Sequence, residues 1–243
     1  GRLKGVANYS LLSRRFDQLV AVSNEMKDML VCERGIASEK VSVIHNGMKL
    51  PYEQRHSSSR AFSVIGLCVR LFPLKNYGLF VQTAARVADH FPKIQFELAG
   101  DGPQMEVLQD QCEQARLEGI FSFLGHVSDM SAFYQGLDIY VSTSVHEGIP
   151  MSVLEAMGHG LPVIAPKVGG FPEIIDHGVD GFLIAEHDPD LFSEACLYLL
   201  NDLDLLERMS KAARHKIETR FSEKRMADDY LQLYQKLKPI SCT

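Results

Sequence analysis

The feature that most restricts the fold is an alternation of short apolar runs with segments of helical periodicity. Runs such as Phe62–Val69 and Pro162–Ala165 are almost continuously apolar, which is typical of strands covered on both faces. Strand–helix–strand repetition favours parallel strands, because each helix carries the chain back along the sheet. We therefore predict an α/β fold in which helices cover both faces of a parallel sheet.

The same patterns predict the individual elements along the chain. Strands are expected at Gln18–Val22, Val41–His45, Phe62–Val69, Ile94–Ala99, Ile120–Leu124, Asp138–Ser142, Pro162–Ala165 and Gly181–Ala185. Helices are expected at Asn24–Arg34, Tyr77–His90, Pro103–Glu118, Met130–Gln135, Pro150–Met157, Pro189–Leu200, Leu203–Arg220 and Glu223–Leu237.

A polar segment divides the chain into two unequal parts. Residues 51–60, PYEQRHSSSR, lack apolar periodicity and predict a linker. The strands that follow it suffice for a domain over residues 61–220. Only two predicted strands precede it, and two strands do not form a stable sheet by themselves. Residues 1–50 therefore resemble the last part of another α/β domain, whose start lies outside this sequence.

The segment 221–243 carries a final amphipathic helix. Its apolar residues recur at helical spacing, so the helix needs a further surface to cover, and the absent domain is the expected one. These residues are Met226, Tyr230, Leu233, Tyr234 and Leu237.

Composition restricts the classes of partner that the protein is expected to bind and indicates its cellular compartment. The net charge of −6 argues against nucleic acid as the main partner, because a phosphate backbone favours a basic face. The five cysteines form no CxxC pair, which is typical of reduced thiols in a cytoplasmic protein. Apolar runs are far shorter than the roughly 18 residues of a membrane helix.

Segment 1–16 is amphipathic and somewhat basic. Two interpretations of it remain open, a helix face exposed to solvent and peripheral contact with anionic lipid.

One loop and the helix after it combine features of a ligand site. Glu147 follows a predicted strand, and Pro150 opens a predicted helix, where its missing N–H costs nothing. The amides of Met151 and Ser152 lack helical partners and form a natural anion cradle at the carboxyl edge of the sheet. Glu155 follows about a turn and a half into the helix. Paired carboxylates at this spacing suit the recognition of vicinal hydroxyls, and solvated surface charges are the alternative.

A second constellation is CVRLFPLKN, residues 68–76. Arg70 and Lys75 follow a predicted strand and precede a helix, and two cations in such a loop can clamp a diphosphate. The alternative is a solvated basic loop. The sequence contains neither GxGxxG nor GxxxxGK[ST], so it has no dinucleotide fingerprint and no P-loop.

Together these motifs resemble a known family. Five segments, in their order along the chain, are similar to motifs of the GT4 family of retaining glycosyltransferases. They are VIHNG (43–47), VRLFPLKN (69–76), LAGDGP (98–103), FLGHVSDMSAFYQGLDIYVSTS (123–144) and HEGIPMSVLEAMGHGLPVIAPKVGGFPEII (146–175). The resemblance covers nearly the whole chain. It implies a GT-B fold, in which two Rossmann-like domains face each other and the C-terminal one holds a nucleotide-sugar. It also implies that the final helix crosses back onto the N-terminal domain.

The resemblance assigns roles to the charged residues. Arg70 and Lys75 would bind the donor diphosphate and stabilise the leaving group. Glu147, the first acid of the E-x7-E pattern, would contact the donor sugar hydroxyls and shape the catalytic centre. Glu155, the second acid, would bind the ribose diol. The resemblance implies no metal or other cofactor, because GT-B enzymes of this kind need no metal for the diphosphate. A nucleoside-diphosphate sugar is the expected donor substrate.

Other residues would support the donor. The loop at His126 and Val127 would approach the base, although a solvated or packed histidine is the simpler interpretation of His126 and His146. Gly169 and Gly170 would permit a tight turn, which Glu173 would hold in place rather than react. The resemblance assigns backbone contacts with sugar and phosphate to Gly148, Ile149, Pro150, Met151 and Ser152.

The sequence departs from the family pattern at two places. Val69 stands where a glycine usually precedes the arginine, which affects how closely the backbone approaches the phosphate. His45-Asn46-Gly47 replaces the usual Pro-Asn-Gly at the domain junction, and we assign no catalytic role to His45.

Three competing patterns are weaker. HEGIP lacks the second histidine of a zinc-binding HExxH, because Pro150 occupies that place. Residues 202–204, DLD, begin a helix, where acids favour the dipole, so they are not expected to bind metal. Glu147 and Glu155 as a glycosidase pair would leave Arg70 and Lys75 without a role.

The expected function is transfer of a sugar, with retention of configuration, from a UDP- or GDP-sugar to a hydroxyl of a carbohydrate or lipid-linked acceptor. The expected location is the cytoplasm, with the inner membrane surface as an alternative site of action. Three rivals stay open. They are nucleotide-sugar binding without turnover, sugar-nucleotide epimerisation, and polymerisation of the glycogen-synthase type.

Overall fold

A computed structural model of the protein describes residues 15–51 and 61–237. The predicted linker therefore lies outside the described residues except for Pro51, as do most of segment 1–16 and Cys242. Among the described residues, no helix combines the length and apolar character needed to cross a bilayer.

The main body is built on a six-stranded sheet with the order β5-β4-β3-β6-β7-β8 and only parallel pairs. The predicted α/β fold with a parallel sheet is confirmed. Because the strand order reverses between β3 and β6, the crevice at their carboxyl ends is the expected ligand position. The strands are β3 (Ser63–Cys68), β4 (Ile94–Ala99), β5 (Phe121–Gly125), β6 (Ile139–Val141), β7 (Val163–Pro166) and β8 (Gly181–Ile184).

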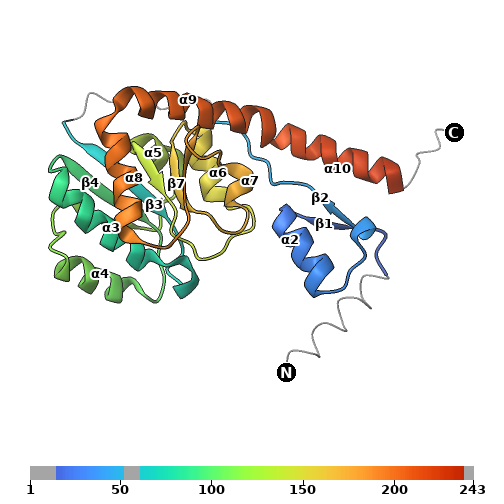
Figure 1. Cartoon of the computed structure of the whole chain (residues 1–243), viewed down its shortest axis with the longest axis horizontal. Coiled ribbons are helices and arrows are strands. Elements are labelled where there is room, and N and C mark those ends of the chain that lie inside the picture. The colour runs from blue at the N-terminus through green and yellow to red at the C-terminus, as the bar shows by residue number, and fades with distance from the viewer. Residues whose placement is uncertain (1–14, 52–60, 238–243) are drawn as a thin grey trace.

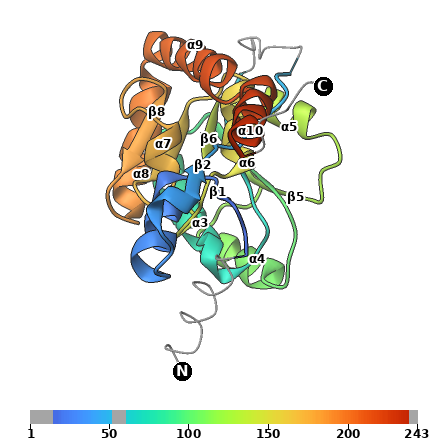
Figure 2. The ribbon, with the colours of Figure 1, turned by 90° about the vertical axis from the view of Figure 1, so that its right-hand side faces the viewer.

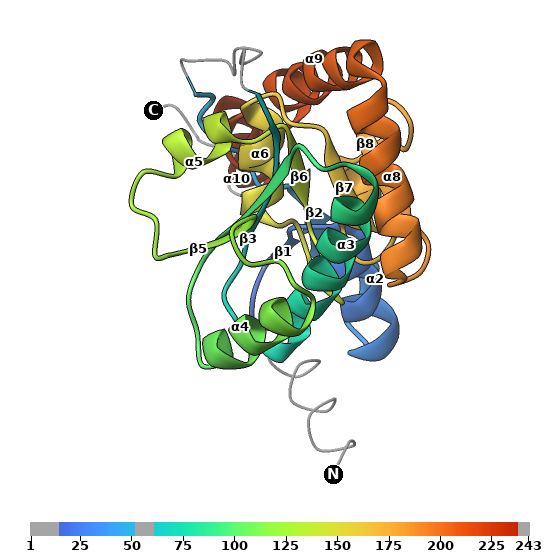
Figure 3. The same ribbon diagram turned by 90° about the vertical axis from the view of Figure 1, so that its left-hand side faces the viewer.

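Helices cover both faces of this sheet (Figures 1 and 3). Side chains alternate between two cores, as in β3, where Ile65 and Leu67 point to one core and Val64 points to the other. The first core lies under α3 (Tyr77–His90), α4 (Met105–Gln114) and α8 (Pro189–Asn201). The second lies under α5 (Met130–Gly136), α6 (Met151–Gly158) and α7 (Phe171–Ile174), and α9 (Leu203–Arg220) contributes to both.

Residues 15–48, here called the N-terminal unit, form a separate small body. Strands β1 (Leu19–Ala21) and β2 (Val41–Val43) pair in parallel, with α2 (Asn24–Asp28) beside them. Its own core of Ala21, Ile36 and Val41 is small, as two strands allow. The unit lies apart from the six-stranded sheet at one end of the molecule (Figure 1).

Helix α10 (Glu223–Leu237) starts against the junction between the two bodies. The Met48 amide donates to the Phe221 carbonyl at 2.8 Å, and Arg225 donates to the His45 carbonyl at 2.7 Å. The helix then extends toward the N-terminal unit, and Figure 2 looks onto this end of the molecule. Its predicted apolar face is partly covered, because Met226, Tyr230 and Leu233 are half-buried whereas Tyr234 is 62% exposed.

The predicted elements match the structure closely, and α3, α9, α10 and β4 agree at both ends. The predicted helix Asn24–Arg34 instead divides into α2 and a π-helical turn, Met29–Glu33. The predicted helix Pro103–Glu118 is shorter, because Arg116 takes a left-handed φ of 56° beyond its end. Short elements were missed, namely α7 and the 3₁₀ turns Ser38–Lys40 and Pro73–Lys75, since three or four residues carry no periodicity.

A buried lysine on α9 holds the chain after α7 in place. Lys216, with a side chain only 7% exposed, donates to the Ile174 carbonyl at 2.9 Å. It also pairs with Asp176 and with the fully buried Asp180. Burial raises the pKa of Asp180 more than Lys216 lowers it, so this carboxylate depends on its partner.

Replacing Lys216 is expected to destabilise the protein strongly. K216M should lower the free energy of unfolding by about 3–5 kcal/mol, because it leaves Asp180 buried without its cation. Urea unfolding followed by circular dichroism measures the difference. K211M is the matched control, since Lys211 pairs with Glu207 on the exposed side of the same helix, and its midpoint should stay near that of the wild type. Equal effects of the two variants would contradict this role of Lys216.

Candidate active site

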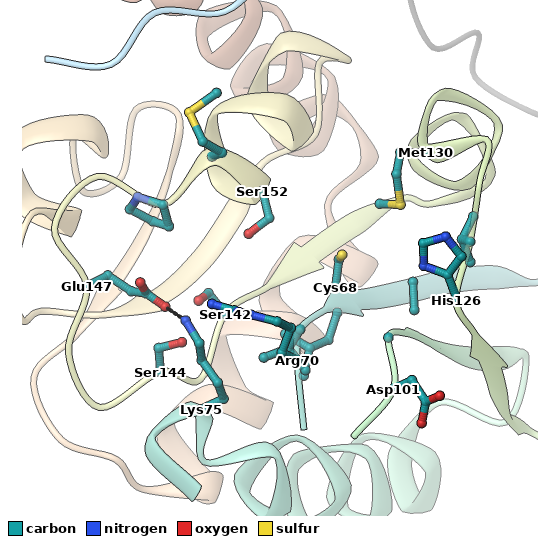
Figure 4. A pocket seen from close by; sticks show the side chains of 17 residues that line it. Cys68, Arg70, Lys75, Asp101, His126, Met130, Ser142, Ser144, Glu147 and Ser152 are labelled. Atoms are coloured by element: carbon teal, nitrogen blue, oxygen red, sulfur yellow. Dashed lines mark hydrogen bonds and ion pairs between the residues drawn. The ribbon is translucent and has the colours of Figure 1, made fainter. Parts of the chain in front are cut away.

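A cavity of about 570 Å³ opens at the carboxyl edge of the sheet, at the reversal of strand order (Figure 4). Residues from the ends of β3, β4 and β6 and from the first turn of α6 surround it. Its lining consists of Leu67, Cys68, Val69, Arg70, Lys75, Ala99, Gly100, Asp101, His126, Val127, Met130, Ser142, Ser144, Glu147, Pro150, Met151 and Ser152.

Lys75 and Glu147 form an ion pair on the wall of this cavity (Figure 4). Their side chains are 26% and 18% exposed, so each charge is partly withdrawn from water. The loop after β6 fixes the lysine backbone, because Thr143 donates to the Lys75 carbonyl at 2.9 Å. The Val145 amide also donates to the Leu74 carbonyl at 3.0 Å. The two predicted site charges thus meet directly.

Arg70 enters the same cavity from the end of β3. Its side chain is exposed and points toward Ser142 and the Lys75–Glu147 pair (Figure 4). No carboxylate of the described residues pairs with Arg70. Lys75 and Glu147 offset each other, and Asp101, the other carboxylate on the lining, accepts from the Gly102 amide at 2.6 Å. Arg70 is therefore the lining cation that is available to an anionic ligand. Val69, in the place usual for glycine, is buried in the first core and still lines the cavity.

The N-terminus of α6 faces the cavity with its first-turn amides. Pro150 is the N-cap residue with an extended ψ of 120°, so the prediction that the helix begins at Pro150 is wrong by one residue. No side chain caps this end, which leaves the first amides available to an anion. Met151 and Ser152 line the cavity, as the anion-cradle prediction requires.

The other residues of the predicted donor site lie beside the cavity rather than on its lining. Gly148 faces a neighbouring cavity of about 350 Å³ against α2. Ile149 is buried, and its carbonyl accepts from Asn46 at 3.2 Å. Glu155 is half-buried one helical turn beyond Ser152.

His126 and Val127 line the cavity as predicted, whereas His146 lies 3.6 Å from Glu25 and borders the neighbouring cavity. Sequence reasoning missed several lining residues. Some of them lie in the segments LAGDGP and STS, which follow predicted strands, so their position at the carboxyl edge of the sheet was a signal that could have found them. The residues missed are Cys68, Asp101, Met130, Ser142 and Ser144.

Two glycines let the chain before α7 approach the Glu147 loop. Gly170 donates to the Glu147 carbonyl at 2.9 Å, and a Cβ on Gly170 would lie 1.7 Å from the Gly148 oxygen. A Cβ on Gly169, whose φ is +57°, would lie 2.1 Å from the Glu147 oxygen. The predicted tight turn is present, and its function is to hold the loop that carries Glu147.

Glu173 holds its turn in place, as predicted, and it does so by binding the N-terminal unit, a partner that the sequence did not identify. Its carboxylate accepts from the Asn24 amide at 2.8 Å, from the Asn24 side chain at 2.6 Å and from the Glu25 amide at 3.3 Å. His45 contacts it at 2.7 Å. The carboxylate thus occupies the amide end of α2, where a negative charge is stabilised, and connects the two bodies beside the Glu147 loop.

The described residues contain no group of three or more His, Cys, Asp or Glu side chains placed to hold a metal ion. Asp202 is the N-cap of α9 and accepts from the Leu205 amide at 2.9 Å, as expected for an acid at a helix start.

An open α/β sheet whose carboxyl edge brings Arg70, Lys75 and a helix N-terminus to one cavity defines a class of anion-binding, GT-B-type domains. Residues 54–216 match the family described as "Glycosyl transferases group 1". The chain belongs to this family of glycosyltransferases.

Relatives support the same assignment. The chain is 29% identical over 231 residues to UDP-Gal:alpha-D-GlcNAc-diphosphoundecaprenol alpha-1,3-galactosyltransferase of Escherichia coli, covering 89% of this chain and 59% of the relative. It is 26% identical over 234 residues to an uncharacterized glycosyltransferase of Methanocaldococcus jannaschii, covering 90% of this chain and 60% of the relative. The chain thus spans only part of both relatives.

A solved structure shares the fold. Anabaena Alr3699/HepE in complex with UDP superposes with a TM-score of 0.88 at 23% identity, and the match covers 95% of this chain and 68% of that one. At this identity the likeness establishes the GT-B-type fold alone.

A methyl group at Gly170 is expected to displace the Glu147 loop. G170A should lower the free energy of unfolding by about 1–3 kcal/mol, because its Cβ would clash with the Gly148 backbone. G136A is the control, since a Cβ at the end of α5 meets nothing within 4 Å. Thermal unfolding of the two variants measures the difference. Equal melting temperatures for G170A and the wild type would contradict the proposed close contact.

The contact made by Glu173 should depend on pH. Burial raises the pKa of Glu173, but the hydrogen bonds from Asn24, His45 and Glu25 outweigh it and hold the pKa below its usual value. Such a carboxylate stabilises the fold above its unfolded pKa and ceases to do so as pH falls through the folded one. The stability difference between wild type and E173Q should therefore shrink below about pH 4.3. Urea titrations from pH 7 to pH 3 test this, and an unchanging difference would refute it.

Proposed function

We propose that this chain binds the nucleoside diphosphate of a sugar donor and supplies the donor side of a retaining glycosyltransferase. The observation that carries the proposal is the meeting of Arg70, Lys75 and the uncapped start of α6 around one cavity. Two cations and a helix N-terminus complement a diphosphate, which carries two to three negative charges.

The ion pair of Lys75 suggests how the donor is received. Without ligand, Glu147 neutralises Lys75. An arriving diphosphate would take over the lysine and leave the Glu147 carboxylate to accept hydrogen bonds from sugar hydroxyls. In the transfer, the bond between the anomeric carbon and the diphosphate oxygen breaks, and its electron pair stays on the diphosphate. The oxygen of the acceptor hydroxyl forms the new bond to the anomeric carbon, and the proton of that hydroxyl passes to the departing diphosphate. Arg70, Lys75 and the amides of Met151 and Ser152 would stabilise the charge on the diphosphate, so no separate cofactor is needed.

The relatives favour a uridine nucleotide and a carbohydrate or lipid-linked acceptor. The Escherichia coli relative is named for a UDP-galactose donor and a diphosphoundecaprenol-linked acceptor, and HepE binds UDP. We extend the donor class to this chain, and we propose a cytoplasmic enzyme that acts at the inner membrane surface. Nucleotide binding without turnover is the rival function.

Loss of either cation should abolish tight nucleotide binding. Titration calorimetry of the chain with UDP, GDP and ADP should give selective binding, and R70A and K75A should each weaken it about tenfold or more. R86A is the control, because Arg86 is an exposed arginine paired with Asp190 on the surface. Unchanged affinity in both R70A and K75A, or no diphosphate bound by the wild type, would overturn the proposal. Sugar transfer by the chain itself would eliminate the binding-only rival.

A further inference from the structure

Glu155 lies one helical turn beyond a residue of the cavity lining, although Glu155 itself is not on the lining. Ser152 and Glu155 are three residues apart on α6 and share one face of the helix, and Ser152 lines the cavity. Cys68 is also on the lining, and the charge of the Glu155 carboxylate affects the pKa of its thiol. Burial and then the charge of Glu155 raise the pKa of Cys68 to about 11. The Glu155 charge is therefore close to the cavity wall between β3 and α5.

One side chain fixes this carboxylate. Tyr134 on α5 is 1% exposed, and its hydroxyl donates to Oε2 of Glu155 at 2.9 Å. Within the described part of the chain, this is the hydrogen bond that the structure gives to the Glu155 carboxylate. The second oxygen, Oε1, thus retains its capacity to accept from a ligand.

Packing leaves the tyrosine little freedom to move. Its ring lies 5.9 Å from that of Tyr140 and 5.2 Å from that of His159. The start of the same helix borders the cavity through Met130, one turn before Tyr134. Tyr134 therefore connects the wall formed by α5 with the acid on α6, and a rigid donor of this kind restricts where the carboxylate can point.

We propose that Tyr134 is a positioning residue that orients Glu155 toward the ribose hydroxyls of the bound nucleotide, an inference that rests on the proposed donor function. A vicinal diol donates two hydrogen bonds to a carboxylate, and both weaken when the carboxylate turns away. Tyr134 itself does not touch the ligand. Its hydroxyl acts through the direction it imposes on Oε1 and Oε2.

A purely structural role for Tyr134 predicts a different result. If the ring only fills the second core, removal of its hydroxyl would weaken all nucleotides alike through general loosening. If the hydroxyl orients Glu155, only nucleotides that carry the diol should lose affinity. Tyr140 offers the matched control, because it is an equally buried ring whose hydroxyl donates to the Cys68 carbonyl at 3.1 Å instead.

The experiment compares UDP with 2′,3′-dideoxy-UDP by titration calorimetry on the wild type, Y134F, Y140F, E155Q and the Y134F/E155Q double variant. Y134F should weaken UDP about tenfold, since hydrogen bonds to charged groups are among the stronger ones, and should leave the dideoxy nucleotide unchanged. E155Q should remove most of the preference for the diol, and Y134F should add little to it. Y140F should affect both nucleotides equally or neither.

Other outcomes separate this inference from the proposed function. Equal weakening of UDP and dideoxy-UDP by Y134F would overturn the positioning role, as would a diol-specific loss in Y140F. If UDP binding depends on Arg70 and Lys75 but Y134F leaves the preference for the diol intact, the donor function stands and the role of Tyr134 falls. If the wild type binds neither nucleotide, both fall together.

Discussion

The close approach of the Gly169–Gly170 backbone to the Glu147–Gly148 backbone is the contact on which the site depends. It brings the end of β7 against the loop after β6, and only residues without a Cβ allow that distance. The loop so held places Glu147 beside Lys75 and leads directly into α6, whose first amides face the cavity. The α7 turn behind the glycines is held in turn by Lys216, through the Ile174 carbonyl.

Electrostatics then determine what the cavity can accept. Lys75 and Glu147 neutralise each other, and Asp101 on the lining balances the formal charge of Arg70. The attraction for an anion therefore comes from the position of Arg70 near the N-terminal end of the α6 dipole and not from a net charge. A ligand can replace the Lys75–Glu147 pair when it offers a partner to each of the two charges. A nucleotide-sugar is such a ligand, since it offers a diphosphate to the lysine and hydroxyls to the glutamate.

The sequence predicted the layered fold and most element boundaries, because continuous strands and long amphipathic helices have strong periodicity. It also brought Arg70, Lys75 and Glu147 to the same edge, since parallel strands end together. It could not predict α7, which has only four residues. Nor could it find the partners of Glu173, because Asn24 is 149 residues away and the contact arises only from the arrangement of two bodies. The bond from Tyr134 to Glu155 was missed for the same reason, as it joins two helices through tertiary packing.

The N-terminal unit meets the Glu147 loop and α7 through polar groups, and its Val22 and Met48 also pack against the second core. Glu173 accepts from Asn24, Glu25 and His45, and Glu25 also faces His146 on the Glu147 loop. An interface between two bodies of one chain that contains many polar contacts is easier to separate than a continuous apolar core. Relative movement of the two bodies is therefore the default expectation. His146 immediately precedes Glu147. The Glu25–His146 contact therefore connects the N-terminal unit directly to the residue before the one that we propose contacts the donor sugar.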